Sequence, residues 1–364
     1  MTTKPTEPTH DHMMAQYDER SAEYGRFTER LASLIGQLVE AEGIKIHSVT
    51  YRVKAKVSLA QKLSSGEGPY SSLEEVTDVA GVRVITYFPD DVDRVSDLVE
   101  REFEVDEERS VDKRALMDPE RFGYMSVHYI VKFSLARLAL PEYSTFRDVV
   151  AEVQVRSILQ HAWAEIEHDL GYKSKQAVPA HIRRDFARVA AFLETADRDF
   201  GTIRDALSDY SAIVEQRVAA AEVDIDLDQA SLSAFLGAKG SAKADTAVAK
   251  ALQGKMDRRK KLSIPALLEK LDYLHVRTIE ELTLALTSSI DGLLSFVARF
   301  REIRGPIRPE RRYGVGISIF YLGYFMAARG RDVQQIEDYL AAMRIGAASR
   351  RPAFAQELAK AAAG

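Results

Sequence analysis

The segment Ala151–Lys173 changes from a two-residue repeat to a helical one, and this change limits the possible folds more than any other feature. In its first part, apolar residues alternate with Glu152, Gln154 and Arg156, which predicts a strand with one buried face. A helix is predicted from Ser157, which has a glutamine three residues later as its capping-box partner. A carboxylate, an amide and a guanidinium aligned at a strand end suit a phosphate-and-metal site. An ordinary half-buried strand before a solvated helix explains the pattern equally well.

Length and composition set the broad class of the protein. A chain of 364 residues exceeds the usual limit of a single hydrophobic core, about 250–300 residues, so two domains are expected. The hydrophobic share of 46% and the charged share of 29% are typical of a soluble globular protein. The net charge of -5 provides no overall positive field for nucleic acid, so any such contact would come from local patches.

Two further features bear on the compartment. The sequence has no cysteine, which excludes disulfides and thiolate zinc sites and fits a cytoplasmic protein. The N-terminal residues are polar and lack the apolar core of a signal peptide. The longest apolar run, Ile317–Ala328, is too short to span a bilayer, so we expect a buried helix there and no membrane partner.

A basic segment lies early in the chain. Arg52 and Lys54 alternate on a predicted short strand, and a helix predicted from about Val57 carries Ser58 and Lys62 four residues apart. Three cations and a hydroxyl at a strand-to-helix junction could bind a polyphosphate. A solvated basic edge explains the same residues.

An acidic residue comes directly before the next predicted strand. Asp78 precedes a buried strand over Val82–Phe88, and Arg83 lies just inside it. Such an aspartate could ligate a metal, although aspartate is also common in turns.

A loop is predicted over the highly charged residues 101–121, and another strand over 127–133. The tyrosine before that strand could stack on a base or belong to the core. The candidate side chains of this region are Lys113, Arg121, Tyr124, Ser126 and His128.

Four strings of residues together resemble a known family. E-V-Q-V-R-S, with W-A-E-I-E-H and Y-K after it, is similar to the closing signature of the RelA/SpoT-type alarmone synthetase domain. R-V-K followed by serine and lysine resembles the ATP-binding segment of small alarmone synthetases, and D-V-A-G-V-R-V resembles the family's D-I-A-G-x-R motif. G-Y-x-S-x-H resembles its acceptor-nucleotide loop, with Met125 where the family usually has arginine or glutamine. The four motifs follow the family's order over residues 45–175.

The resemblance implies an α+β fold, a mixed sheet flanked by helices and related to nucleotidyltransferases, and a pyrophosphokinase that uses ATP as donor. It implies that Asp78 and Glu152 hold Mg²⁺ and that Glu152 orients or deprotonates a ribose 3′-hydroxyl. The implied ATP-binding residues are Arg52, Lys54, Ser58, Lys62, Arg83, Gln154 and Arg156. The implied acceptor-binding residues are Tyr124, which stacks on the base, together with Lys113, Arg121, Ser126 and His128.

Three functions stay open at this point. The first is an alarmone synthetase with GDP or GTP as acceptor, without hydrolase activity, because too few residues precede the first motif. The second is the same chemistry on the 3′ end of tRNA, as in toxin-type relatives; Met125 and basic clusters favour it, and the acidic net charge opposes it. The third is a non-enzymatic nucleotide-sensing module, which the presence of Asp78, Glu152 and Tyr124 disfavours.

The sequence also predicts an order of domains. It consists of a disordered tail (1–12), the synthetase domain (13–178), long connecting helices (179–223), a linker-like segment (224–254) and an all-helical C-terminal domain (255–364). The connecting helices carry apolar residues from Ile182 to Leu207 in steps of four and three. This heptad seam is expected to pack on the synthetase domain or on a second subunit, which would make a homo-oligomer.

The C-terminal domain is expected to regulate synthesis, to bind a partner protein or to grip an RNA acceptor. Its basic clusters at 255–261 and 299–312 are usually solvated faces, although each could contact nucleic acid. Gly314 and Gly316 do not indicate a nucleotide loop, because no strand-turn-helix frame is expected around them.

Overall fold

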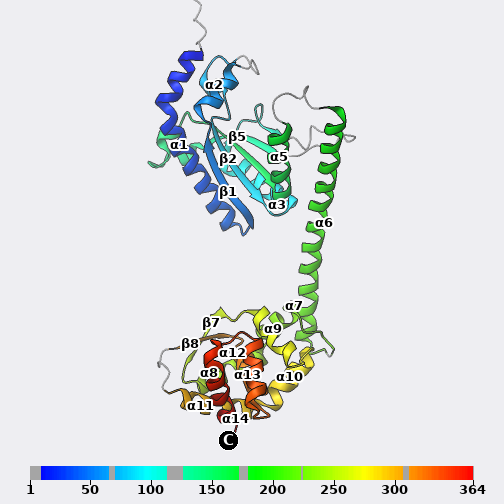
Figure 1. The fold of residues 1–364 in the computed structure, drawn as a ribbon. Coiled ribbons are helices and arrows are strands. Elements are labelled where there is room, and N and C mark those ends of the chain that lie inside the picture. The colour runs from blue at the N-terminus through cyan, green and yellow to red at the C-terminus, as the bar shows by residue number, and fades with distance from the viewer. Residues whose placement is uncertain are drawn as a thin grey trace, which may run out of the picture. The chain divides into compact units, whose positions relative to one another are not determined.

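A computed structural model describes residues 10–64, 70–112, 126–171, 179–222, 224–305 and 311–363. The chain divides into two compact units, residues 1–204 and 205–364, and each unit has its own hydrophobic core (Figure 1). The disordered tail expected over 1–12 is wrong for its last residues, since the first helix begins at His10. Met13 of this helix is fully buried, and this anchor orders the residues just before it.

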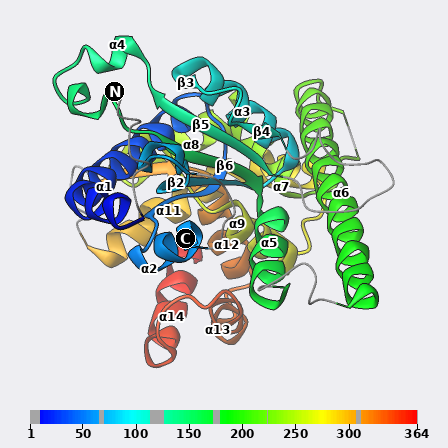
Figure 2. The ribbon, with the colours of Figure 1, turned by 90° about the horizontal axis from the view of Figure 1, so that it is seen from above.

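The first unit contains a six-stranded mixed sheet, which confirms the expected fold class. Its strands lie in the order β1-β2-β6-β5-β3, with β4 also paired to β5 (Figures 1 and 2). β2 and β6 run parallel, and the other neighbours run antiparallel. The strands are β1 Ile46–Val53, β2 Ala80–Thr86, β3 Phe103–Val105, β4 Val111–Asp112, β5 Val127–Phe133 and β6 Ala151–Ser157.

The loop predicted over 101–121 is wrong for the part that is described. The preceding helix continues to Glu102, and β3 and β4 both pair with β5. Phe103 lies opposite Phe133 in this pairing, and both rings are buried. The strand forms because tertiary pairing buries these rings, which the charged local sequence does not indicate.

Helices cover the sheet of the first unit. They are α1 His10–Ala41, α2 Lys56–Ser64, α3 Pro89–Glu102, α4 Leu135–Leu138 and α5 Ile158–Gly171, with short 3₁₀ turns at Leu73–Glu75 and Ser144–Phe146. Phe27, Leu31 and Ile35 of α1 recur at helical spacing and are fully buried in the same core as the apolar side of the sheet. One side of each central strand is therefore occupied by packing, and the other side is left for polar residues.

The predicted capping box joins β6 to α5. The Ser157 N–H donates to Gln160 Oε1 at 2.8 Å, and the Gln160 N–H donates to Ser157 Oγ at 3.1 Å. The Ser157 hydroxyl also donates to the buried carboxylate of Asp197 on the next helix, α6 Ala180–Ala219. These bonds fix the direction in which the chain leaves the sheet.

The heptad seam predicted for residues 182–207 forms part of one continuous helix, α6. Within the first unit, the buried residues of α6 are Ala190 and Asp197, whereas Val189, Phe200 and Ile203 of the seam are exposed. Phe186 of the seam packs edge-to-face on Trp163 of α5, with ring centroids 6.5 Å apart, so the seam contacts the first unit at this residue. Packing of the seam on a second subunit stays a prediction.

The second unit is built mainly of helices around the apolar helix α12, but it is not all-helical as expected, because Lys255–Lys261 and Arg312–Val315 pair as two parallel strands. Its elements are α7 Gln229–Gly237, α8 Lys239–Ala251, β7 Lys255–Lys261, α9 Ile264–Tyr273, α10 Ile279–Ser288, α11 Ile290–Arg304, β8 Arg312–Val315, α12 Ile317–Ala328, a 3₁₀ turn Ala348–Arg350, α13 Val333–Ala342 and α14 Arg351–Ala362. Helices α8, α9, α11, α13 and α14 pack on α12, which is buried as expected. Residues 224–254 contain α7 and α8, not a linker, because small residues such as Ala244, Val248 and Ala249 pack into this core.

A strand-turn-helix frame does surround Gly314 and Gly316, so the reason for discounting a nucleotide loop there is wrong. The nitrogen atoms at this helix start already have an anionic partner. The Asp245 carboxylate accepts the Gly316 and Ser318 N–H groups, both at 2.8 Å, and the Ser318 hydroxyl at 2.6 Å. A buried carboxylate therefore takes the place that a phosphate would take at a helix N-terminus.

Among the described residues, no single helix is both long enough and apolar enough to cross a bilayer. The bent pair of α10 and α11 has the required length and apolarity only when the two helices are taken together.

Candidate active site

The register of the sheet brings polar residues of four strands to one face. Residues directly opposite each other on neighbouring strands point to the same face. Arg52 lies opposite Gly81, which lies opposite Glu152. In the next row, Arg83 lies opposite Gln154, and Gln154 lies opposite His128. The predicted residues of all four motifs therefore share one face of the sheet.

Asp78 holds two lysines at the edge of this face. Its Oδ2 is 2.8 Å from Lys54 Nζ, and its Oδ1 is 3.0 Å from Lys62 Nζ. Lys54 follows the last residue of β1, and Lys62 comes from α2. Burial alone would raise the pKa of Asp78, but hydrogen bonds from both lysines outweigh burial and lower this pKa. The aspartate is therefore ionised, and it positions two of the predicted phosphate-binding cations.

Glu152 lies in a chain of hydrogen bonds. Its Oε1 accepts a bond from His128 Nδ1 at 2.6 Å, and its Oε2 accepts one from Gln154 Nε2 at 2.8 Å. Arg156, which is buried, donates to Gln154 Oε1. On the other side, Ser126 Oγ lies 2.6 Å from His128 Nε2. When His128 Nδ1 donates to Glu152, the Nε2 of the neutral ring accepts the Ser126 hydroxyl.

These bonds keep Glu152 charged. Burial would raise the pKa of the Glu152 carboxyl, but the hydrogen bonds from His128 and from the amide of Gln154 lower it overall. Both oxygens are held by donors, so the carboxylate has a fixed orientation. A fixed, ionised carboxylate suits either a metal ligand or a base.

One cavity of 230 Å³ joins the predicted groups. It is lined by Thr50, Tyr51, Arg52, Asp78, Gly81, Val82, Arg83, Glu152 and Gln154. Two carboxylates and two guanidinium groups thus meet at a single cleft of the first unit. Such a mixture is suited to phosphate oxygens that are shared between cations and a metal ion.

The donor set fits Mg²⁺. The described residues contain no cluster of three or more histidines or carboxylates that would form a complete metal cage. Mg²⁺ is usually held by only one or two carboxylates, with substrate phosphates and water supplying the other ligands. Asp78 and Glu152 match this number. They are also close enough for the charge of Asp78 to raise the pKa of Glu152, a repulsion that a divalent cation would relieve.

One contact at the site was missed by the sequence reasoning. Arg83 Nη1 is 2.9 Å from Glu165 Oε1 on α5, and His161 Nδ1 lies 3.8 Å from the same oxygen. Glu165 lies within the W-A-E-I-E-H string, two turns after Ser157, so helical spacing could have placed it over the sheet. Arg83 is therefore held from the helix as well as by its place on β2.

Not all predicted residues can be placed. Lys113, Arg121 and Tyr124 lie outside the described residues, and so does Met125. Ser58 is exposed on α2, one turn before Lys62, and it does not line the cavity. Ser126 and His128, assigned to the acceptor, are bonded to each other, and His128 is also bonded to Glu152.

The fold and the cleft can be compared with those of known proteins. Residues 51–177 match the family model described as the region found in RelA / SpoT proteins. This match confirms the resemblance predicted from the four motifs. The matched segment ends before the second unit begins.

Several proteins similar to this chain are named as GTP pyrophosphokinases or as members of that family. GTP pyrophosphokinase YjbM of Bacillus subtilis is 26% identical over 174 residues, which cover 47% of this chain and 78% of that protein. GTP pyrophosphokinase YwaC of the same organism is 29% identical over 150 residues, which cover 39% and 68%. A solved structure of a GTP pyrophosphokinase family protein from Streptococcus pneumoniae is 25% identical, with a TM-score of 0.45, over 54% of this chain and 97% of that one.

Proposed function

We propose that this enzyme transfers the β,γ-diphosphate of ATP to the 3′-hydroxyl of GDP or GTP and so makes a (p)ppGpp-type alarmone. The observation that carries the proposal is the ionised Glu152, held by His128 and Gln154 at the cleft that Asp78 and Arg83 also line. The names of the similar proteins support a guanosine nucleotide as acceptor.

The residues at the cleft have different roles in the proposed reaction. The 3′-oxygen attacks the β-phosphorus of ATP, the bond between the α,β-bridging oxygen and the β-phosphorus breaks, and AMP leaves. The proton of the attacking hydroxyl goes to Glu152, the fixed base. Arg52 and Arg83 lie where they neutralise charge that develops on the phosphates, together with the lysines that Asp78 holds.

Asp78 and Glu152 are the groups that would hold Mg²⁺. A bound Mg²⁺ neutralises charge on the transferred phosphates. Arg156 and Gln154 act on the site by keeping Glu152 in place, since Arg156 itself is buried.

Labelled transfer from ATP tests the proposal. Purified full-length protein is incubated with Mg²⁺, ATP labelled in the γ-phosphate, and GDP, GTP or tRNA as acceptor. We expect equal amounts of AMP and of labelled guanosine nucleotide. Label in the tRNA, with none in GDP or GTP, would show that tRNA is the acceptor of the same transfer reaction. Absence of both AMP and labelled product with every acceptor would contradict the enzymatic function.

A further inference from the structure

Strand β7 in the second unit contains a wide bulge. It pairs in parallel with β8, with Met256 opposite Tyr313 and Lys261 opposite Val315. Five residue steps on β7 thus match two steps on β8, so three extra residues of β7 leave the ladder. This is larger than an ordinary β-bulge, which adds one residue. The part that leaves the ladder lies within residues 257–260.

The bulge is held by the backbone of the neighbouring strand. After it, the Leu262 N–H donates to the Val315 carbonyl at 3.0 Å. A side chain at Gly314 would bring a Cβ atom to 2.8 Å from the Lys260 carbonyl oxygen, so only glycine lets the two strands approach this closely. The bulge is therefore fixed by the close pairing of β7 with β8.

We call β7 and β8, with the residue just before β8, the basic ribbon. Its exposed cations are Lys255, Arg258, Arg259, Lys260, Lys261, Arg311 and Arg312. Within the described part of the chain, none of these seven forms an ion pair with a carboxylate. The one acid of the bulge, Asp257, accepts the backbone N–H of Arg259 at 3.1 Å. Neighbouring unpaired like charges repel each other, so protein stability does not account for this cluster.

The charge of the second unit also differs from that of the whole chain. From Asp205 to Gly364, lysine and arginine outnumber aspartate and glutamate by 23 to 20, whereas before Asp205 they are outnumbered by 27 to 35. The whole chain has a net charge of -5, but the second unit taken alone has a positive net charge. Net charge therefore opposes contact with nucleic acid in the first unit only.

We propose that the basic ribbon binds the phosphate backbone of a nucleic acid. The cations come from both strands, over residues 255–261 and 311–312, so they are spread along the ribbon and not gathered around one small anion. No large apolar side chain is exposed among the described residues of the ribbon, which disfavours a membrane surface. The same observation means that no exposed aromatic ring is available to stack on bases. Binding is therefore independent of sequence and dependent on salt.

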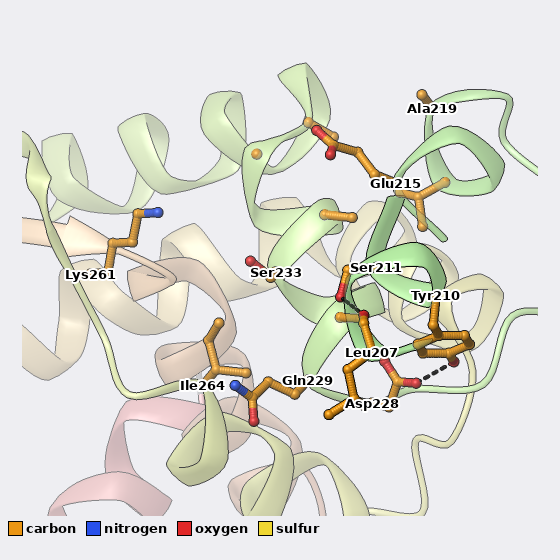
Figure 3. Close-up of a pocket in the computed structure, with 15 residues that line it drawn as sticks. Leu207, Tyr210, Ser211, Glu215, Ala219, Asp228, Gln229, Ser233, Lys261 and Ile264 are labelled. Atoms are coloured by element: carbon orange, nitrogen blue, oxygen red, sulfur yellow. Dashed lines mark hydrogen bonds between the residues drawn. The ribbon is translucent and has the colours of Figure 1, made fainter. Parts of the chain in front are cut away.

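A nearby groove of the same unit is a poorer anion site. It has a volume of 880 Å³, and Figure 3 shows Lys261 at one side of it and Tyr210 with Asp228 at the other. Its charged lining residues are Glu215 and Asp228 against the single cation Lys261, and Tyr210 donates to the Asp228 carboxylate. The charged side chains that line the groove have a negative net charge. An anionic ligand is therefore expected to bind to the basic ribbon and not in the groove.

Fluorescence anisotropy of the full-length protein tests this surface. The probes are a labelled single-stranded RNA of mixed sequence and a DNA duplex of the same length, each titrated without ATP at several salt concentrations. The test variant is Arg258→Gln with Arg259→Gln and Lys260→Gln. The control is Arg329→Gln with Arg331→Gln and Arg344→Gln, three exposed arginines of the same unit away from the ribbon, so both variants lose the same charge.

We expect the ribbon variant to bind the RNA at least ~10-fold more weakly than the unchanged protein. The slope of log affinity against log salt should fall by about 2, because each lost contact with a single strand contributes ~0.7. The control should keep the original slope. If the ribbon variant does not fold, Arg258→Gln and Arg259→Gln are tested singly, each with a slope change of ~0.7.

Four results would overturn the proposal: no binding to either probe at low salt, equal loss in both triple variants, unchanged binding by the ribbon variant, or full competition by stoichiometric tripolyphosphate. Binding to phosphatidylserine vesicles without binding to either probe would assign the ribbon to a membrane and would also reject it. None of these results depends on pyrophosphokinase activity, so this proposal and the proposed function can fail separately.

Discussion

At the scale of single residues, the site depends on carboxylates whose charge is fixed by their neighbours. Asp78 and Glu152 are both largely buried, yet hydrogen bonds to cations, an imidazole and an amide keep the pKa of each below its ordinary value. The same bonds also set the direction of each carboxylate. Replacing either group by its amide keeps the shape and removes the charge.

Glu152→Gln should lower the turnover number at least ~10²-fold, because general-base and electrostatic contributions are each of this order. The measurement is the rate of AMP release with saturating ATP and acceptor. Circular dichroism serves as the control, since the amide fits the same space and the fold should be unchanged. Near-normal turnover in a folded variant would contradict the assignment of Glu152 as the base.

His128→Phe should change the pH dependence of the reaction. The ring remains, but the hydrogen bond that lowers the pKa of Glu152 is lost, so burial raises this pKa. The base acts when ionised, so the acid limb of kcat/KM against pH should move to higher pH. Ser126→Ala, which leaves the bond between His128 and Glu152 intact, should move it less. A uniform loss of rate without a shift would mean that His128 has only a packing role.

At the scale of elements, the start of α12 shows how one side chain can organise a unit. The Asp245 carboxylate of α8 accepts hydrogen bonds from Gly316 and Ser318, and thereby joins two helices that are far apart in sequence. Gly316 has a φ of 94°, in the left-handed region, and a Cβ there would lie 2.9 Å from Leu267. The turn before α12 therefore requires this glycine and this aspartate together.

Asp245→Ala should destabilise the second unit by about 1–3 kcal/mol, because two buried N–H groups and a hydroxyl lose their acceptor. Thermal unfolding followed by circular dichroism measures the effect. The matched control is Asp272→Ala on α9, where the side chain is exposed and the expected change is within ~0.5 kcal/mol. Equal effects of the two substitutions would show that the buried hydrogen bonds do not stabilise α12.

At the scale of the whole molecule, the two cores share no residue. Scanning calorimetry should therefore resolve two unfolding transitions, since separate domains violate two-state behaviour. ATP with Mg²⁺ should raise the midpoint of only one of them, because the cleft lies within the first unit. A single transition that shifts as a whole would mean that the units unfold as one cooperative structure.

Removal of the second unit tests its expected regulatory role. A chain that ends near Val223 retains the candidate cleft and the core of the first unit. We expect it to differ from the full-length protein in rate or in response to nucleic acid. If the shortened protein is folded and unchanged in rate, acceptor choice and nucleic-acid response, the regulatory role is rejected.

Much of the first unit follows from local sequence. The alternation in β6, the capping box at Ser157 and the helical spacing in α1 are confirmed, because these patterns depend on side-chain direction and short-range hydrogen bonds. The four motifs also identify the RelA/SpoT domain, which the family match confirms. Local pattern failed for β3 and β4, whose formation depends on pairing with β5, a partner that their own residues do not specify.

The sequence by itself determined the type of fold and the resemblance to the RelA/SpoT region, and it pointed to Asp78, Arg83 and Glu152 of the cleft, since these reside in short motifs with fixed spacing. Only the tertiary structure decided how those residues combine. The register of four strands places His128 beside Glu152, and α5 brings Glu165 to Arg83. It also decided that residues 224–254 pack as helices and that a bulge exposes the cations of β7. The physical reason is that pairing register and burial depend on distant partners, whereas propensity and capping depend on neighbours along the chain.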